Sequence, residues 1–413
     1  MTGLTDESSS SEIRNYLDVR RWLEEHHRKH LALLDRFLLE LRRGRLKQVT
    51  MDRRIVIHRT VDFLRHMVGS TKWKNPAQLH LLLRGIGHEL QTAGHHEPSI
   101  GNVVRRIMAA VREEANFDNE HTSVGDTGGR LSLQSMLWAL PQHVKASNRS
   151  ISVMSGDHQR QESFADADVV GPEYPAYYYQ ERSGLKSTVM EAMDEIVNEL
   201  EDLYKNINEQ VVNHIHSGEL ILTSGRSKTV ELFLKAAAAK KLDFQVIVCE
   251  GAPGNSGHSM AKVLADAGLD VTLINDSAVF AVMARVNKVI LPAHAVLANG
   301  SLMTPSGGNL VALAAKHNSV PVVCTTGLFK LCPIFPHEGQ DTMNDLLSPS
   351  SVMEYAEAQA KLLEDIEFVN PLHDIIKPEH VDLFITNVGS FQPSFLYRLL
   401  AEYYHSDDWD CFD

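Results

Sequence analysis

Three segments of the sequence carry residue types that a ligand site or a catalytic centre would need. The first is "TSGRS" (223–227), where hydroxyls and an arginine follow a short apolar run. The second is the glycine-rich turn "CEGAPGNSGH" (249–258), and the third combines "NDSAVF" (275–280) with "ANGSLMTPSGGN" (298–309). In an open α/β sheet, ligands bind just past the carboxyl ends of the strands. The segments 223–227, 249–258 and 275–280 are predicted to lie at such strand ends.

The residue types alone leave the chemistry of these segments open. Ser224, Arg226 or Ser227 could act at the first corner, or Arg226 and Ser227 could bind an anion at the start of the next helix. A structural cap of that helix is the simpler interpretation. Asp276 could be a general acid or base, or it could cap the helix that follows it. The glycine-rich turn has neither GxGxxG spacing nor a GK[ST] sequence, so it does not indicate a nucleotide site.

The sequence gives no indication of a metal or a cofactor. The four cysteines form no CxxC pair, and His214 and His216, two residues apart, point to different sides of a helix. Buried thiols in a reducing compartment are therefore predicted. The net charge of −13 argues against general nucleic-acid binding. No apolar leader and no membrane-spanning run is recognised, so a cytosolic protein is expected.

The first half of the chain is predicted to be helical. Stretches such as "LALLDRFLLELRRGRL" and "PAQLHLLLRGIGHELQ" repeat apolar residues at helical spacing, which predicts a helical domain over 1–116. Its Ser-rich residues 1–12 are expected to fray. Residues 117–182 are polar and lack a sustained period, so we expect a flexible insertion there. A long connecting helix is predicted over 183–216.

The second half has a different pattern. From 217 to 413, short apolar runs such as "ELILT", "FQVIVC" and "NKVIL" alternate with helical segments. Apolar strands separated by helices are typical of a parallel sheet covered on both faces. The sequence therefore predicts an α/β protein, in which an N-terminal helical domain precedes a doubly wound, Rossmann-like domain. The aromatic and acidic segment "YYHSDDWDCFD" at 403–413 could dock on a partner or fray.

The segment "DSAVFAVMARVNKVILPAHAVLANGSLMTPSGGNLVALAAKHNSVPVVC" resembles one known family. This family contains the alpha, beta and delta regulatory subunits of eukaryotic translation initiation factor 2B, together with isomerases of methylthioribose-1-phosphate and ribose-1,5-bisphosphate. The similarity covers about 185–413. Within the family, "LTSGRSKTVELFLKAA", "APGNSGHSMAKVLADAGL" and "FKLCPIFP" are most similar to the beta subunits.

The resemblance also assigns expected roles to single positions. The isomerases have a catalytic cysteine in "LTHC", and this chain has Gly225 there. Their catalytic aspartate corresponds to Asp276, which is present. A phosphate-binding arginine and a lysine are replaced by Ala252 and Pro305. Without these groups, proton transfer on a sugar phosphate has little support.

Two further positions of the isomerase loop, Asn299 and Gly300, are retained. They complete a predicted relict pocket with Arg226, Ser227 and Asp276 that has no catalytic role. An isomerase with a rearranged site is the alternative.

The resemblance implies a non-catalytic regulatory subunit of the guanine-nucleotide exchange factor for initiation factor 2. Its implied partners are the alpha, gamma, delta and epsilon subunits of initiation factor 2B, of which epsilon carries the exchange activity. Initiation factor 2 itself, through its phosphorylated alpha subunit, is a further implied partner. Clustered cations of the helical domain are candidates for sensing that phosphate, and they are expected to face solvent: Arg42, Arg43, Arg45, Arg53 and Arg54.

Overall fold

The structure is a computed structural model that describes most of the chain. The described residues are 19–43, 52–94, 97–121, 174–182, 184–336, 345–360 and 365–412. The predicted fraying of residues 1–12 and most of the predicted flexible insertion lie outside these ranges.

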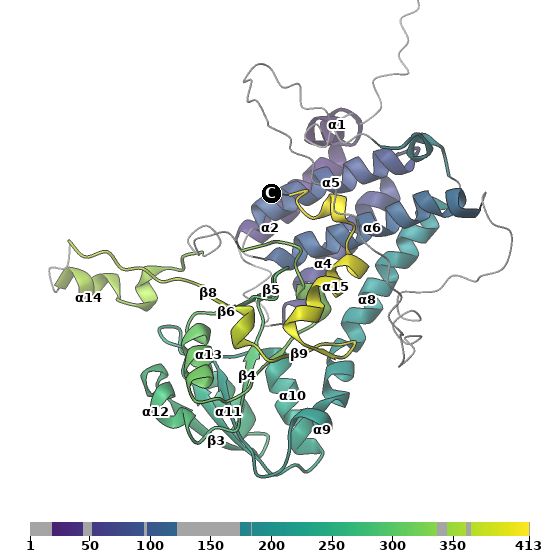
Figure 1. Ribbon diagram of the computed structural model, residues 1–413. Helices are drawn as coiled ribbons and strands as arrows, with labels where there is room; N and C mark the ends of the chain where they lie inside the picture. Colours follow the sequence, from purple (N-terminus) through teal and green to yellow (C-terminus); the bar gives the residue numbers. More distant parts are fainter. Residues whose placement is uncertain are drawn as a thin grey trace, which may run out of the picture.

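The N-terminal part is a bundle of helices, as predicted (Figure 1). Its helices are α1 (Val19–His26), α2 (Arg28–Arg42), α4 (Arg54–Ser70), α5 (Pro76–Ala93) and α6 (Pro98–His121). Helix α5 begins where the Asn75 side chain accepts a hydrogen bond from the Gln78 amide at 2.9 Å, with Pro76 in the first turn. Buried residues surround most of α5, so it is the central helix of the bundle.

The edges of the expected insertion are ordered parts of this bundle. Helix α6 continues to His121, five residues past the expected boundary at 116. Beyond the undescribed segment, a short 3₁₀ helix (Ala176–Tyr179) returns to the bundle and buries Tyr178. The aromatic run "YPAYYY" thus supplies apolar surface for packing. This packing could not be predicted from the sequence, because the run has no helical or strand periodicity.

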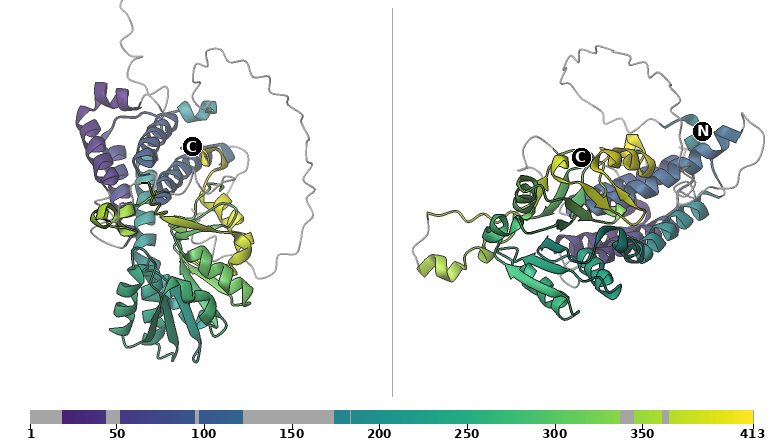
Figure 2. Two further views of the ribbon diagram at one scale, coloured as in Figure 1. Left: turned by 90° about the vertical axis from the view of Figure 1, so that its left-hand side faces the viewer. Right: turned by 60° about the horizontal axis from the view of Figure 1, so that its bottom comes forward.

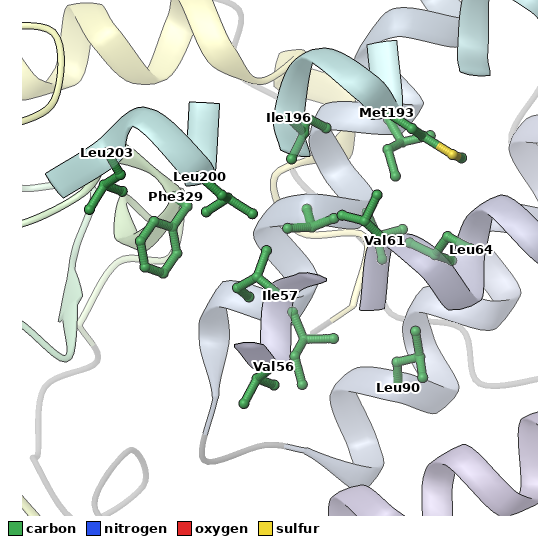
Figure 3. Packing of buried hydrophobic residues seen from close by; sticks show 14 of the residues in the cluster. Val56, Ile57, Val61, Leu64, Leu90, Met193, Ile196, Leu200, Leu203 and Phe329 are labelled. Carbon is green, nitrogen blue, oxygen red and sulfur yellow. The ribbon is translucent and has the colours of Figure 1, made fainter. Parts of the chain in front are cut away.

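A long helix, α8 (Leu185–Glu209), joins the two halves of the chain and ends next to the short α9 (Val211–His214). It packs against α4 and α6 at one end and against α10 at the other. Its buried side chains recur every three or four residues and form one apolar stripe. Figure 3 shows part of the resulting core, in which Leu200 and Leu203 of α8 lie near Ile57 of α4 and Phe329. The two halves therefore share one hydrophobic cluster.

The second half contains a seven-stranded sheet with helices on its faces (Figure 2). Its strands are β1 (Leu220–Ser224), β2 (Gln245–Cys249), β3 (Asp270–Ile274), β4 (Lys288–Pro292), β7 (Val322–Thr325), β9 (Leu383–Ile385) and β10 (Ser390–Phe391). They lie in the order β10-β9-β7-β4-β1-β2-β3, and only β10 runs antiparallel to its neighbour. Strands β3-β2-β1-β4-β7-β9 have the doubly wound order 3-2-1-4-5-6. The predicted fold class is confirmed.

Helices and a small second sheet complete this half. The helices are α10 (Lys228–Ala239), α11 (Ser256–Ala265), α12 (Val279–Met283), α13 (Gly308–His317), α14 (Tyr355–Ala360) and α15 (Leu396–Tyr403). The small sheet is antiparallel and consists of β5 (Ala295–Val296), β6 (Leu302–Pro305) and β8 (His373–Ile376). Among the described helices, none is long and apolar enough to cross a membrane.

Candidate functional site

A small cavity lies where the strand order of the sheet reverses, between β1 and β4. Doubly wound folds usually bind their ligands at this point, outside the carboxyl ends of the strands. The cavity has a volume of about 70 Å³. The loop after β1, the end of β4, the helical bundle and α8 all contribute to its walls. The lining residues are Asp52, Arg53, Arg54, Leu203, Tyr204, Arg226, Ser227, Lys228, Thr229, Pro292, Ala293, His294, Pro305, Phe329 and Lys330.

The bundle supplies two arginines to the cavity, and each is held by an acid of this chain. Arg53 donates to both carboxylate oxygens of the buried Glu97, at 2.9 and 3.1 Å, and also contacts His294. Arg54 donates to Asp52 at 2.8 and 3.1 Å, and its guanidinium lies 3.8 Å from the ring centre of Tyr204. Although burial alone would raise it, the hydrogen bonds from Arg54 and Tyr204 lower the pKa of Asp52.

The α/β half supplies three more cations. Lys228 lies 3.0 Å from a carboxylate oxygen of the buried Glu231, and Arg226 lies 3.8 Å from the other oxygen. Lys330 is buried and donates to the Ala293 carbonyl at 2.8 Å. Burial, assisted by the nearby Arg53, lowers the pKa of Lys330 to about 8. The cavity wall is therefore cationic, but each of these charges already has an acid or a carbonyl within 4 Å.

The first predicted corner lies at this cavity. Gly225 directly follows β1 and has a φ of +60°, a conformation that favours glycine, and a Cβ there would lie 3.1 Å from the Ser256 hydroxyl. Arg226 and Ser227 both line the cavity. Ser227 stands at the N-cap position of α10, but its side chain makes no capping hydrogen bond. The expectation of a side-chain cap at Ser227 is therefore wrong, because its hydroxyl does not bond the first amides of the helix.

Asp276 does not lie on the cavity wall. It starts a short 3₁₀ helix after β3, and its carboxylate accepts hydrogen bonds from the amides of Gly251 at 3.0 Å and Ala252 at 2.7 Å. It thus holds the glycine-rich turn after β2. The expectation that Asp276 caps the helix that follows it is therefore wrong. Because β3 is the edge strand, β2 lies between it and β1, the nearer of the two strands at the reversal point.

The remaining predicted pocket residues form a turn. Asn299 is exposed, and its side chain accepts a hydrogen bond from the Ser301 amide at 2.9 Å in the connection between β5 and β6. Gly300 is buried with a φ of +84°, and a Cβ there would lie 3.1 Å from the Pro393 carbonyl oxygen. The structure therefore brings only Arg226 and Ser227 of the five together at the cavity.

The cations predicted on the bundle surface fall into two groups. Arg42 and Arg43 are exposed at the end of α2, as expected. Arg45 lies outside the described residues. Arg53 and Arg54 are only partly exposed, so the expectation that they face solvent is wrong: Arg53 contacts His294 of the α/β half, and Arg54 bonds to the Leu200 carbonyl of α8. Helical spacing could not predict these contacts, because Arg53 precedes α4 and the partners of both arginines include residues from distant segments of the chain.

The four thiols are free and buried, as predicted: Cys249, Cys324, Cys332 and Cys411. Within the described ranges, no group of three or more histidine, cysteine or acidic side chains could hold a metal ion.

Comparison with known proteins links this geometry to one family. The model of the initiation factor 2 subunit family matches residues 52–393. The "Translation initiation factor eIF2B subunit beta" of Dictyostelium discoideum is 39% identical over 354 residues, covering 84% of this chain and 90% of that protein. The "Ribose 1,5-bisphosphate isomerase" of Methanocaldococcus jannaschii is 30% identical over 223 residues, 53% of this chain and 70% of the isomerase.

Two solved structures are similar over nearly the whole chain. The crystal structure of eIF2B beta from Chaetomium thermophilum aligns with a TM-score of 0.61 and 25% identity, covering 96% of this chain and 97% of that one. The tetrameric eIF2B-beta2-delta2 complex from C. thermophilum contains a chain that aligns with the same TM-score and identity, covering 93% of this chain and 98% of that one.

Proposed function

This chain belongs to the initiation factor 2 subunit family, and we propose that it is a non-catalytic regulatory subunit of the guanine-nucleotide exchange factor for translation initiation factor 2. Its 39% identity to a relative named eIF2B subunit beta, over most of both chains, supports this function. The family also contains isomerases, so the cavity has to be considered as a possible catalytic site.

The size and the internal pairing of the cavity carry the non-catalytic part of the proposal. Small-molecule sites usually enclose about 300–1,000 Å³, whereas this cavity has about 70 Å³. Two of its arginines, Arg53 and Arg54, are already bonded to Glu97 and Asp52, so a phosphate would have to displace these acids. The strand end offers a glycine, and the Asp276 carboxylate is bonded to two backbone amides. Among the described residues, the two positions that correspond to the isomerases' catalytic cysteine and aspartate therefore offer no free acid or base.

An isomerase assay tests this directly. The purified chain is incubated with ribose 1,5-bisphosphate, and ketose product is measured beside the M. jannaschii isomerase as a positive control. We expect no product above the blank, because neither the space nor the acid–base pair for the reaction is present. A turnover rate within about a thousandfold of that of the control enzyme would contradict the proposal. Such a rate is far above the rate expected of a site that positions the substrate but lacks its acid or base.

The proposed partners are other subunits of the same factor in the cytosol. The solved beta2-delta2 complex supports delta as the direct partner, and the alpha, gamma and epsilon subunits then follow as members of the same assembly. Co-expression with a delta subunit and affinity purification through a tag on that subunit tests the pairing. We expect stoichiometric recovery of this chain; its loss in the wash with an intact delta subunit would argue against the assembly.

We also propose that the exposed end of α2 contributes to sensing the phosphorylated alpha subunit of initiation factor 2. Arg42 and Arg43 are exposed and have no acid within reach among the described residues. A phosphate brings close to two negative charges, which such cations bind in a charge-assisted way. Replacing both with Glu in the assembled factor should reduce its preference for the phosphorylated partner and leave assembly intact. An unchanged preference would place the sensing surface elsewhere.

A further inference from the structure

The segment after α15 leaves the α/β half and crosses the helical bundle (Figure 1). Tyr404 still belongs to the α/β half, where its hydroxyl donates to the Leu331 carbonyl at 2.7 Å. Cys411 and Phe412, only a few residues later, belong to the hydrophobic cluster of the bundle. This segment was expected to fray or to dock on a partner, and it docks on the chain's own α5 and α6. We call the residues 405–412 the strap.

A clamp of buried side chains holds one carboxylate of the strap. Arg112 donates to both oxygens of Asp408, each at 2.7 Å, and His80 lies 3.3 Å from the same carboxylate. Arg105 donates from Nε to the Asp408 carbonyl at 3.0 Å. Asp408 and His80 are fully buried and Arg105 nearly so. A bidentate pair that is removed from water has both high strength and a defined geometry.

A slot without side chains holds the aromatic ring of the strap. Gly87 of α5 and Gly101 of α6 face Phe412, and a Cβ on these glycines would lie 2.5 and 3.3 Å from its ring. The Arg105 guanidinium covers the ring, with 4.7 Å to its centre. Both glycines lie inside helices, where glycine is less favourable than alanine. The ring of Phe412 leaves no room for a side chain at Gly87, whereas at Gly101 the nearest atom to a Cβ is Gln91 Oε1, at 2.6 Å.

The groove has more hydrogen-bond donors than the strap satisfies. Neither Nη atom of the buried Arg105 has an oxygen or nitrogen acceptor among the described residues, and the strap group that interacts with this guanidinium is the Cys411 thiol, a weak acceptor. A buried donor without an acceptor is destabilising, and more so when it is charged. Arg112 faces two strap carboxylates, Asp408 at 2.7 Å and Asp407 at 3.7 Å, whereas Arg105 bonds only to the Asp408 carbonyl. The strap is itself acidic and contains Asp407 and Asp410 beside Asp408. The groove is thus suited to segments that are rich in carboxylates and end in an aromatic ring.

We propose that the surface between α5 and α6 is a peptide-binding groove for acidic segments with an aromatic residue four positions after an aspartate. The strap occupies it in cis and thereby ties the helical bundle to the α/β half. This inference does not depend on the proposed subunit function. It follows from the carboxylate clamp, the glycine slot and the weakly paired donors of Arg105, which together form a recognition site rather than a chance contact.

The test compares binding of a strap peptide to chains with a tight or a loosened strap. The probe is the fluorescent peptide YHSDDWDCFD, followed by anisotropy. The chain with the loosened strap is the full-length double variant Asp408→Asn and Phe412→Ala, in which the clamp and ring contacts are removed and the groove is free. In the wild-type chain the strap competes at an effective concentration of about 1 mM or more. We therefore expect the peptide to bind the loosened chain at least about tenfold more tightly than the wild type.

Controls separate the groove from unspecific attraction. A peptide with the same two replacements should bind neither chain, and Arg105→Met in the loosened chain should weaken binding of the original peptide at least tenfold. Equal binding to the wild-type and loosened chains, or no binding to the loosened chain, would overturn the proposal. If the double variant does not fold, Phe412→Leu replaces it, and hydrogen exchange of residues 405–412 must then be faster than in the wild type and slowed again by the peptide.

Discussion

Replacing Arg54 with alanine should destabilise the junction between the bundle and α8. Arg54 donates to both oxygens of Asp52 and, at 3.0 Å, to the Leu200 carbonyl in α8, and it stacks on Tyr204 of the same helix. A hydrogen bond to a charged group contributes about 1.5–3 kcal/mol, and a cation–π contact about 0.5–2 kcal/mol. Arg54 is about half buried, so solvent reduces both contributions, and we expect a total loss of about 2–4 kcal/mol.

The assay is thermal unfolding of the purified chain, with two matched variants. Arg54→Lys retains the charge but not the fork of donors or the planar stack, so it should fall between alanine and the wild type. Arg43→Ala removes an exposed arginine and should change the unfolding free energy by about 0.5 kcal/mol or less. For the alanine variant at Arg54, we expect Tm to fall by several degrees.

The outcome that refutes this reasoning is equal stability. If Arg54→Ala unfolds within about 0.5 kcal/mol of Arg43→Ala, the contacts to Asp52, Leu200 and Tyr204 do not hold the junction. The arginine would then be the solvent-facing residue that helical spacing had predicted, and it would return to the candidates for phosphate sensing.

Three further outcomes follow from the site and the strap. Gly225→Cys should yield no isomerase activity with ribose 1,5-bisphosphate and should lower stability by about 1–2 kcal/mol, because φ at this position is +60°; clear product would show that the cavity can act on a sugar phosphate. Burial lowers the pKa of His80 despite the opposing effect of Asp408, so the folded state keeps this residue neutral. The groups that face it are Asp408, Arg112, Arg84 and Tyr174. Since the unfolded chain takes up the proton near pH 6.5, the wild type should lose stability relative to His80→Gln as pH falls from 7.5 to 5 in urea titrations, and parallel profiles would argue against a neutral His80. Burial also raises the pKa of all four thiols, that of Cys249 to about 12, those of Cys332 and Cys411 to about 11, and that of Cys324 further still. An aromatic disulfide reagent at pH 8 should therefore label these thiols only when the chain unfolds.

The fold was predictable because its signals are local. The apolar runs of β1, β2 and β4 are buried on both faces, as parallel strands between helices must be. The stripe along α8 likewise has helical spacing. Such patterns extend over only a few residues, so a helical part followed by a doubly wound sheet could be predicted from the sequence.

The site was predictable only at its first corner. Arg226 and Ser227 follow a strand directly, and that strand lies at the reversal point of the sheet. The other cavity residues come from segments far apart in the chain, and no short motif connects Asp52 or Glu97 with Lys330. Asp276 follows a strand too, but its strand is at the sheet edge. Strand order, which the sequence did not reveal, decides which strand end faces the cavity.

The docking of the strap has a consequence for how the chain acquires its fold. Arg112 and Asp408 are separated by 296 positions, yet they form a buried ion pair within the bundle. During synthesis from the N terminus, α5 and α6 emerge long before the segment that fills the slot at Gly87 and Gly101. The nascent bundle therefore exposes an apolar, cationic groove until the α/β half has been made. Domains that complete early on the ribosome need no later residues, whereas this bundle is closed by almost the last part of the chain that the structure describes. Chaperones that bind exposed apolar surface could bind this groove during that interval. Docking of the strap would end this exposure once the α/β half has been synthesised.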